Sequence, residues 1–202
     1  MKGFHPIKHF LTVERHRHQV IKNGFACGIG FHTLFHDLSK FSPKEFIPSS
    51  HYYQGTSSPI REERRENHGF SFISFHHTKV NRHHWEYWCD FYRGRIIATN
   101  RPYKYIVEYC CDVLSASKTY HPKEFKKENG LFFFQKTKCC YYRTKGTEEF
   151  IEWFFTEYAK NGFRNLKKKR TKKKYEEIRS KYPSTRIFDT LDHTYPIKEK
   201  DR

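Results

Sequence analysis

The sequence predicts an all-α protein built as a bundle of helices, and three observations support this prediction. Apolar residues recur at helical spacing through 6–27 and again through 103–119. The segment Ser42-Pro43-Lys44-Glu45 combines an N-cap, a proline at the first helical position and a capping-box glutamate, which is typical of a helix start. No internal repeat is visible, and no segment suggests a sheet of any size.

The remaining elements follow from breaks in the pattern. Gly28-Ile29-Gly30 ends the first helix, and 48–70 is expected to be a long loop with one helical turn that could serve as a lid. We expect 1–160 to form one helical domain and 161–202 a basic C-terminal helix or tail, exposed over 164–181. The predicted helices cover 6–27, 31–38, a short stretch from 43, 70–78, 82–92, 103–119 and 146–160, with mixed structure over 121–146.

Aromatic residues make up 18% of the 202 residues, with 20 Phe and 14 Tyr, so the core must be built largely from rings. The formal net charge is +17, and much of the excess lies in Lys167–Lys174. This balance favours anionic partners, which include a phosphorylated small molecule, a nucleotide, nucleic acid and an acidic membrane surface. It does not choose among them.

Six cysteines occur without a CxxC spacing, so a zinc ribbon or a thioredoxin-like motif is not expected. The charged N-terminus does not resemble a signal peptide, and we therefore expect reduced thiols in a cytoplasmic protein. The longest apolar run, Leu131–Phe134, is far too short to cross a bilayer.

Histidine is the unusual feature of the composition, because ten of the fourteen histidines fall between positions 16 and 84. The strongest local signal is the pair His36-Asp37, which can offer an imidazole nitrogen and a carboxylate oxygen to one divalent ion. Lys40 would project from the same side and could neutralise a substrate phosphate. An ordinary Asp37–Lys40 pair at a helix end is the alternative.

Other candidate ligands surround this pair in the sequence. His16 and His18 are about 200° apart on a helix, so only one of them is expected to face the site. Asp112 lies in a mostly apolar helix, where a buried carboxylate needs a partner or a metal, and Glu108 could support it or lie at the surface. Four more histidines, namely His76, His77, His83 and His84, accompany Trp85, Tyr87 and Trp88, and so many rings argue against a solvated surface. These histidines could hold a second metal or bind a phosphate as imidazolium.

The order of these residues resembles the HD superfamily of metal-dependent phosphohydrolases. In that superfamily one His, a His-Asp doublet and a distant Asp hold a metal inside a helical bundle, and the extra histidines here are similar to those of its two-metal members. Over about 7–125 the chain also resembles a family of small bacterial and phage proteins of unknown function, sometimes mislabelled catalase. The matching segments are Lys8–Phe10, His16–Val20, His36–Phe46, Tyr52–Gly55, Ser58-Pro59, His76–Trp88, Asp112 and Ala116–Tyr120.

The resemblance implies an HD-type bundle with one or two divalent ions between its helices, without distinguishing Fe, Mn, Zn and Ni. It places His16, not His18, in the first ligand position. Lys79-Val80 departs from the Gly-Arg that the family tends to have, which bears on how the two His pairs are turned. The expected metal ligands are His16, His36, Asp37, His77, His83, His84 and Asp112. The expected catalytic residues are Asp37, Lys40, His77 and Lys118, and substrate is expected to contact Lys40, Asn81, Arg82 and Lys118.

The leading functional hypothesis is a metal-dependent phosphohydrolase acting on a nucleotide-like or other phosphate ester. One alternative is a di-iron oxygenase of the HD type, because the ligand set alone does not separate the two. Another is a non-catalytic protein that binds nucleic acid through the basic 164–181 segment. A charged tail that only improves solubility would explain that segment equally well.

Overall fold

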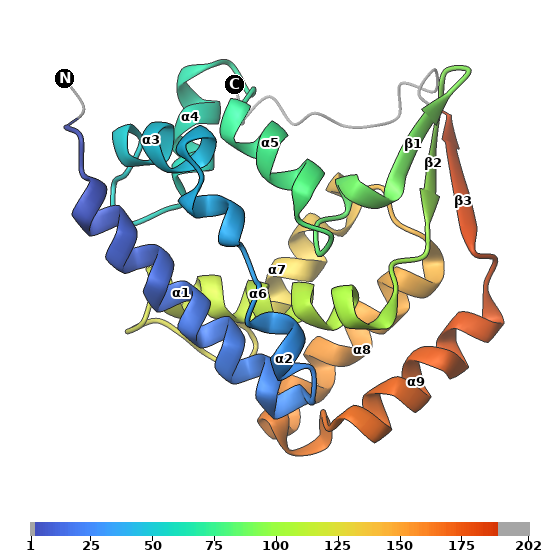
Figure 1. The fold of residues 1–202 in the computed structure, drawn as a ribbon. Coiled ribbons are helices and arrows are strands. Elements are labelled where there is room, and N and C mark those ends of the chain that lie inside the picture. Colours follow the sequence, from blue (N-terminus) through green and yellow to red (C-terminus); the bar gives the residue numbers. More distant parts are fainter. Residues whose placement is uncertain (1–2, 190–202) are drawn as a thin grey trace.

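A computed structural model describes residues 3–189 (Figure 1), and helices dominate the chain, which confirms the mainly α class. The longer helices are α1 (Pro6–Cys27), α3 (Pro43–His51), α5 (Phe72–Val80), α6 (Tyr103–Tyr120), α7 (Asn129–Thr137), α8 (Lys145–Asn161) and α9 (Lys168–Lys181). The shorter elements are α2 (Gly30–Thr33), η1 (Leu38–Phe41), α4 (Pro59–Glu66), η2 (Glu86–Trp88), η3 (Lys138–Cys140) and η4 (Gly162–Asn165). Three strands complete the fold, β1 (Cys89–Tyr92), β2 (Arg95–Thr99) and β3 (Thr185–Asp189).

The central element is α6, which packs against α1, α7 and α8. Their shared core is rich in rings, as the composition predicts, and aliphatic side chains of α6 fill the space between the rings. Phe134, Phe150, Phe154 and Phe155 are all fully buried. A second layer of α3, α4 and α5 lies above the N-terminal half of α1 (Figure 1), and α3 contacts α1, α4 and α5.

Two of the predicted helices are wrong, and both errors concern the histidines. The helix expected over 31–38 stops at Thr33, and the chain turns through Asp37, which has a φ of 53°. The helix expected over 82–92 is instead a turn, then η2, then β1. Each turn places consecutive polar residues on one side of the backbone, which a straight helix would not do.

A small antiparallel sheet occurs where no sheet was expected, with the strand order β1-β2-β3. Its hairpin pairs Cys89 with Ala98, and its two loop residues, Arg93 and Gly94, both have positive φ. The second pairing joins β2 to β3, so that Thr99 faces Thr185 across the ladder. This sheet therefore ties the C-terminal part of the described chain to its middle.

The basic C-terminal helix forms as expected, but one of its faces is packed. Thr171, Tyr175 and Ile178 recur at helical spacing and are buried against the rest of the molecule. The loop expected over 48–70 contains a two-turn helix, α4. All six cysteines are free, and no helix in 3–189 is long and apolar enough to cross a membrane.

Candidate metal centre

Four segments bring the predicted ligands together between α1 and α6. The first group of ligand atoms comes from His16 on α1, His36 in the turn after α2, and Asp112 on α6. His16 Nε2 lies 3.0 Å from Asp112 Oδ1 and 3.4 Å from His36 Nε2. His36 Nε2 lies 3.8 Å from the same Asp112 oxygen. Three ligand atoms from distant parts of the sequence thus surround one point.

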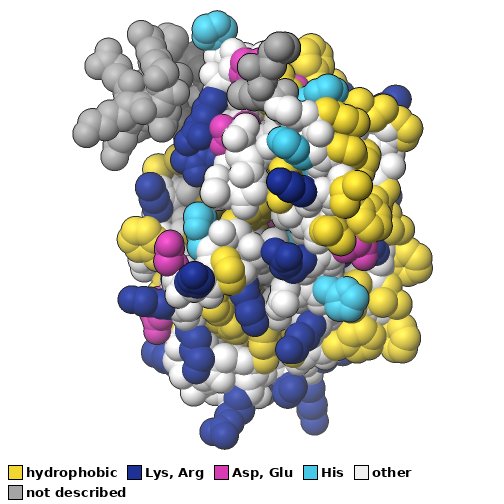
Figure 2. Space-filling model, turned by 90° about the vertical axis from the view of Figure 1, so that its left-hand side faces the viewer, with side chains coloured by type: hydrophobic (Ala, Val, Ile, Leu, Met, Phe, Trp, Pro, Cys, Tyr) yellow, Lys and Arg dark blue, Asp and Glu magenta, His cyan; other side chains and the backbone are white. Residues whose placement is uncertain are grey.

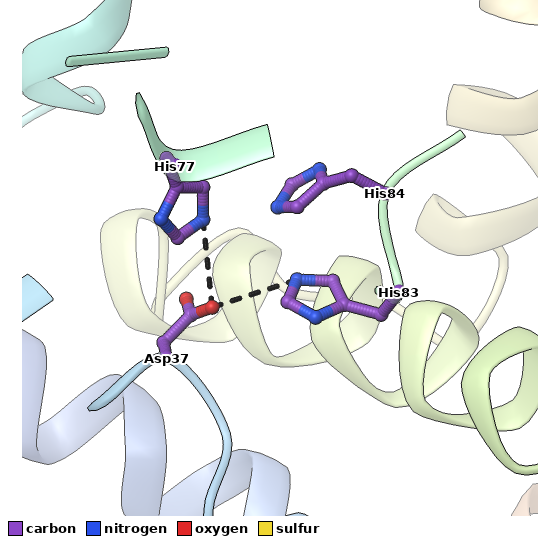
Figure 3. A group of neighbouring side chains, drawn as sticks. All are labelled: Asp37, His77, His83 and His84. Carbon is purple, nitrogen blue, oxygen red and sulfur yellow. Dashed lines mark ion pairs between the residues drawn. The ribbon is translucent and has the colours of Figure 1, made fainter. Parts of the chain in front are cut away.

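The second group consists of Asp37, His77, His83 and His84 (Figure 3). Asp37 Oδ1 lies 3.4 Å from His77 Nε2 and 3.5 Å from His83 Nε2. The His84 ring is 4.2 Å from the His83 ring and 4.7 Å from the His77 ring, centroid to centroid. The turn after α5 is what allows His83 and His84 to face the same aspartate as His77.

Asp37 lies between the two groups. Its Oδ1 faces the second group, whereas its Oδ2 is 3.3 Å from His36 Nε2 in the first. His83 Nε2, in the second group, is also 3.7 Å from Asp112 Oδ2 in the first, so the two groups adjoin at this point as well as at Asp37. A carboxylate in this position can bridge two metal ions.

The hydrogen bonding of these atoms fits a metal better than it fits a purely structural cluster. Asp37 Oδ1, His83 Nε2 and His84 Nε2 are all buried, and none of them makes a hydrogen bond within the described residues. Buried polar atoms without partners cost free energy, about 1–3 kcal/mol each. A divalent cation bound at this point would give all three atoms a partner, and nitrogen and oxygen donors suit Zn, Fe, Mn or Ni.

Two buried glutamates hold histidines from behind. Glu108 accepts hydrogen bonds from His36 Nδ1 at 2.9 Å and from His32 Nε2 at 2.8 Å. Glu45 similarly accepts from His77 Nδ1 at 2.8 Å and from His76 Nδ1 at 2.7 Å. With Nδ1 so engaged, the Nε2 atoms of His36 and His77 face the centre, an arrangement common among metal-ligating histidines.

Glu45 is a residue of the candidate centre that the sequence did not reveal. The motif around Ser42 predicts a capping box, but the Ser42 side chain makes no capping hydrogen bond, and Glu45 points inward instead. Glu108 was expected either to support the candidate ligands or to lie at the surface. It is buried and hydrogen-bonds to His36. His76 faces Glu45 and is not in either ligand group.

The protonation states of the histidines differ within the cluster. Burial lowers the pKa of His16 and of His84, and lowers that of His83 to about 3, so these rings are neutral and carry a free lone pair. For His36 burial acts in the same direction, but Asp37, Glu108 and Asp112 outweigh it and raise the pKa to about 10. A metal ion would displace that proton, because ligating imidazoles are deprotonated.

The other predicted site residues lie at different distances from the candidate centre. Lys40 reaches the centre, with its Nζ 2.7 Å from Asp37 Oδ2, so the simple ion pair also exists. Asn81 lies behind the candidate ligands. Its amide donates to Ser39 Oγ at 2.7 Å and to the His77 carbonyl at 3.0 Å. Arg82 is exposed and donates to the Tyr105 hydroxyl at 3.2 Å.

The structure does not bring Lys118 or His18 to the centre. Lys118 is exposed on α6 and lines neither cavity near the cluster. It follows Asp112 by six residues, which turns it about 240° around the helix. His18 is exposed on α1, whereas His16 is buried in the cluster, as the family resemblance implies.

Two cavities adjoin the cluster. The smaller, about 180 Å³, is lined by Lys40, His16 and Asp112, among others. The larger, about 900 Å³, has His77, His84 and Asp112 on its wall. Its other lining residues include two arginines and several rings, namely Arg61, Arg64, Trp85, Tyr109, Phe132 and Phe133. Ligand pockets commonly occupy about 300–1,000 Å³, so the larger cavity can hold a molecule of nucleotide size.

Comparison with known proteins gives one match. The profile of a family of unknown function, DUF5662, matches residues 5–157, which include every residue of both ligand groups. No curated protein and no solved structure is significantly similar to this chain. Because the match covers most of its length, the chain belongs to DUF5662.

Proposed function

We propose that this protein is a metal-dependent phosphohydrolase that uses two divalent ions sharing Asp37 and cleaves a phosphate ester of nucleotide size. The observation that carries the proposal is the position of Asp37. One of its oxygens faces each ligand group, and the oxygen toward His77 and His83 has no hydrogen-bonding partner among the described residues. The order of the ligands along the chain, which resembles that of the HD superfamily, supports the same reaction class.

Each ion would have its own set of ligands. His16, His36 and Asp112 would hold one ion, and His77, His83 and His84 the other, with Asp37 shared. A pair of divalent ions supplies Lewis acidity to a phosphoryl oxygen and lowers the pKa of nearby water. The glutamates behind His36 and His77 fix the two rings and make them stronger donors.

The remaining groups favour an anionic substrate with an apolar part. Lys40 stays protonated, since Asp37 outweighs burial and raises its pKa, so its ammonium can offset phosphate charge in the smaller cavity. Arg61 and Arg64 line the larger cavity, where a guanidinium can pair with a phosphate through two hydrogen bonds. Phe132 and Phe133 offer an apolar wall in that cavity.

Metal content tests the centre directly. We expect purified protein to hold two ions per chain by inductively coupled plasma mass spectrometry. Asp37→Asn should lose both ions, and His84→Gln should lose only one, because His84 belongs to a single group. His18→Gln is the matched control on α1 and should retain both. A wild-type protein without stoichiometric metal, or an Asp37→Asn variant with the same metal content as the wild type, would overturn the metal centre.

Activity is tested separately on a panel of phosphate esters, comprising p-nitrophenyl phosphate, its bis ester, nucleoside mono- and triphosphates, and cyclic dinucleotides. We expect hydrolysis of at least one nucleotide class that requires Asp37. Arg64→Ala should raise KM for that substrate by about tenfold without changing metal content. Arg64 lines the larger cavity, where its guanidinium would contact the substrate phosphate and not the metal ions. Full metal loading without hydrolysis of any ester would refute the phosphohydrolase and leave the metal centre standing.

A further inference from the structure

A group of three contacting rings, tilted against one another by 41° and 57°, lies outside the metal centre, where η2 meets the start of α6. The Tyr87 and Trp88 rings are 5.3 Å apart, and the Trp88 and Tyr105 rings 5.7 Å, centroid to centroid. Tyr87 is 38% exposed, and the other two rings are half-buried. Tyr87 is the most exposed of the three rings and can meet a further planar group from solvent.

Two exposed cations lie over these rings. The Arg82 guanidinium is 5.3 Å from the centre of the Tyr87 ring and 5.9 Å from that of Tyr105. Lys104 Nζ is 4.8 Å from the centre of the Tyr105 ring. Neither cation forms a salt bridge with a carboxylate of residues 3–189. Their charge is therefore held in place by aromatic faces and is not neutralised.

The start of α9 continues this surface. Tyr103, one residue before Lys104, has its hydroxyl 3.5 Å from the Lys168 carbonyl and 2.5 Å from Thr171 Oγ1. Nine of the residues 160–175 are Lys or Arg, and none is Asp or Glu. Lys167, Lys168 and Lys169 are exposed and make no salt bridge with a described carboxylate.

On the side of the molecule where α1 lies, cationic side chains gather toward one end. In Figure 2 the lower part of the face carries many Lys and Arg side chains and few acidic ones. Figure 1 places the end of α1 and the start of α9 at this lower end. Along α9 itself acidic residues appear only from Glu176 onward, and its first two turns hold six cations and Thr171. Three of these cations pair with glutamates, namely Arg170, Lys172 and Lys174, whereas Lys168 and Lys169 pair with no described carboxylate. Like charges so close together repel each other, and an anionic partner would relieve that repulsion.

We propose that this aromatic–cationic surface, formed by Arg82, Tyr87, Trp88, Lys104, Tyr105 and Lys167–Lys169, binds single-stranded nucleic acid. Exposed rings that stack bases, beside cations that follow the phosphates, are the combination that single-strand binding requires. A duplex keeps its bases stacked inside and would leave the rings unused. An acidic membrane would use the lysines but has no planar groups for the rings.

This surface is distinct from the proposed catalytic site. Arg82 adjoins His83 in the sequence, yet the His83 ring faces Asp37 while Arg82 lies over Tyr87 and Tyr105. None of the residues of the aromatic–cationic surface lines either cavity. Binding therefore does not depend on the proposed hydrolysis, and each can fail without the other.

The first experiment measures fluorescence anisotropy of a labelled 12-nucleotide single strand, as DNA and as RNA, between 50 and 300 mM salt without added metal. For single strands the slope of log affinity against log salt is about −0.7 per phosphate contact. Lys167/Lys168/Lys169→Ala should thus make that slope shallower by about 2. The matched control Lys123/Lys126/Lys127→Ala removes the same charge from the exposed loop between α6 and α7 and should keep the wild-type slope. An equal loss in both variants would show that binding follows net charge alone, and would overturn the proposal.

The second experiment tests the rings. Base stacking on Trp88 should quench tryptophan fluorescence, and Trp88→Phe should abolish the quench while retaining most of the affinity, because a phenyl ring still stacks. Trp88→Ala should weaken binding by about tenfold or more. Binding without a Trp88-dependent quench, a preference for the 12-base-pair duplex, or binding to anionic phosphatidylserine vesicles alone would each contradict a single-strand surface.

Discussion

Asp37 shows how much of the centre depends on the conformation of one residue. Its φ of 53° lies in the left-handed region, which aspartate tolerates better than most residues. This backbone turn ends the local helical geometry and lets the carboxylate reach both ligand groups. Lys40 and His36 then hold Oδ2, which leaves Oδ1 for the second group. His36 therefore faces only the first group, whereas its neighbour Asp37 reaches both.

Glu108 provides the prediction at this scale. Glu108→Gln retains a hydrogen-bond acceptor for His36 but removes the negative charge behind the ring. We expect the first ion to bind about 10–100-fold more weakly, because loss of such a supporting carboxylate typically costs that much affinity. Competition with a fluorescent zinc chelator measures the change. Glu128→Gln, an exposed residue before α7, should leave both affinities unaltered. Equal affinities in the two variants would mean that Glu108 does not support the ligand.

The side chains that gather at the candidate centre were easier to predict from the sequence than the residues that support them. His36, Asp37 and Asp112 carry an ordered pattern, and the family resemblance selects His16 over His18. Glu45 had no such signal, because its partners His76 and His77 lie 31 and 32 residues away in the sequence. The capping-box motif that begins at Ser42 also offered a local reason for a glutamate at this position. Contacts that form only in the folded chain leave no periodicity in the sequence.

At the scale of elements, the long helices were predictable and the turns were not. The core face of α6 has apolar residues at helical spacing, whereas the chain from Arg82 onward mixes rings and charges that fit either structure. The missed signal for the hairpin was Arg93-Gly94 followed by Ile96, Ile97 and Thr99, since β-branched residues after a turn favour a strand. The packing of this hairpin, and not local preference, decides the outcome.

Alanine substitutions at two helical glycines should change the stability of the protein in opposite directions. A Cβ at Gly130 in α7 would lie 2.7 Å from Phe155 Cδ1 and 2.9 Å from Leu114 Cδ2, so Gly130→Ala should overpack the core. We expect it to lower the free energy of unfolding by about 1–3 kcal/mol. A Cβ at Gly146 in α8 meets nothing nearer than 3.7 Å, so Gly146→Ala should stabilise by about 0.5 kcal/mol. Urea unfolding measures both, and a stabilised Gly130→Ala would show that α7 can move away from α6.

For the whole molecule, the important question is whether the basic C-terminal segment is an appendage or part of the fold. Tyr175 and Ile178 belong to the same buried cluster as Phe150. The Tyr175 hydroxyl donates to the Arg101 carbonyl at 3.0 Å, and the buried Arg101 guanidinium donates to the His83 carbonyl at 2.7 Å. A continuous series of contacts thus connects α9 to the turn that carries His83 and His84. An independent tail would show no such connection.

Substitutions on the two faces of α9 separate these possibilities. Tyr175→Ala with Ile178→Ala removes buried side chains, each worth about 2–5 kcal/mol, so we expect the free energy of unfolding to fall by at least about 4 kcal/mol. In a chain of this size that loss corresponds to a drop in Tm of roughly 8–16 °C. Lys172→Ala with Lys173→Ala changes only exposed cations on the same helix and should leave Tm the same or slightly higher, because it relieves repulsion. Thermal unfolding followed by circular dichroism compares the pairs. If both double variants melt at the wild-type temperature, α9 contributes nothing to the core and behaves as the separate basic element that its composition suggests.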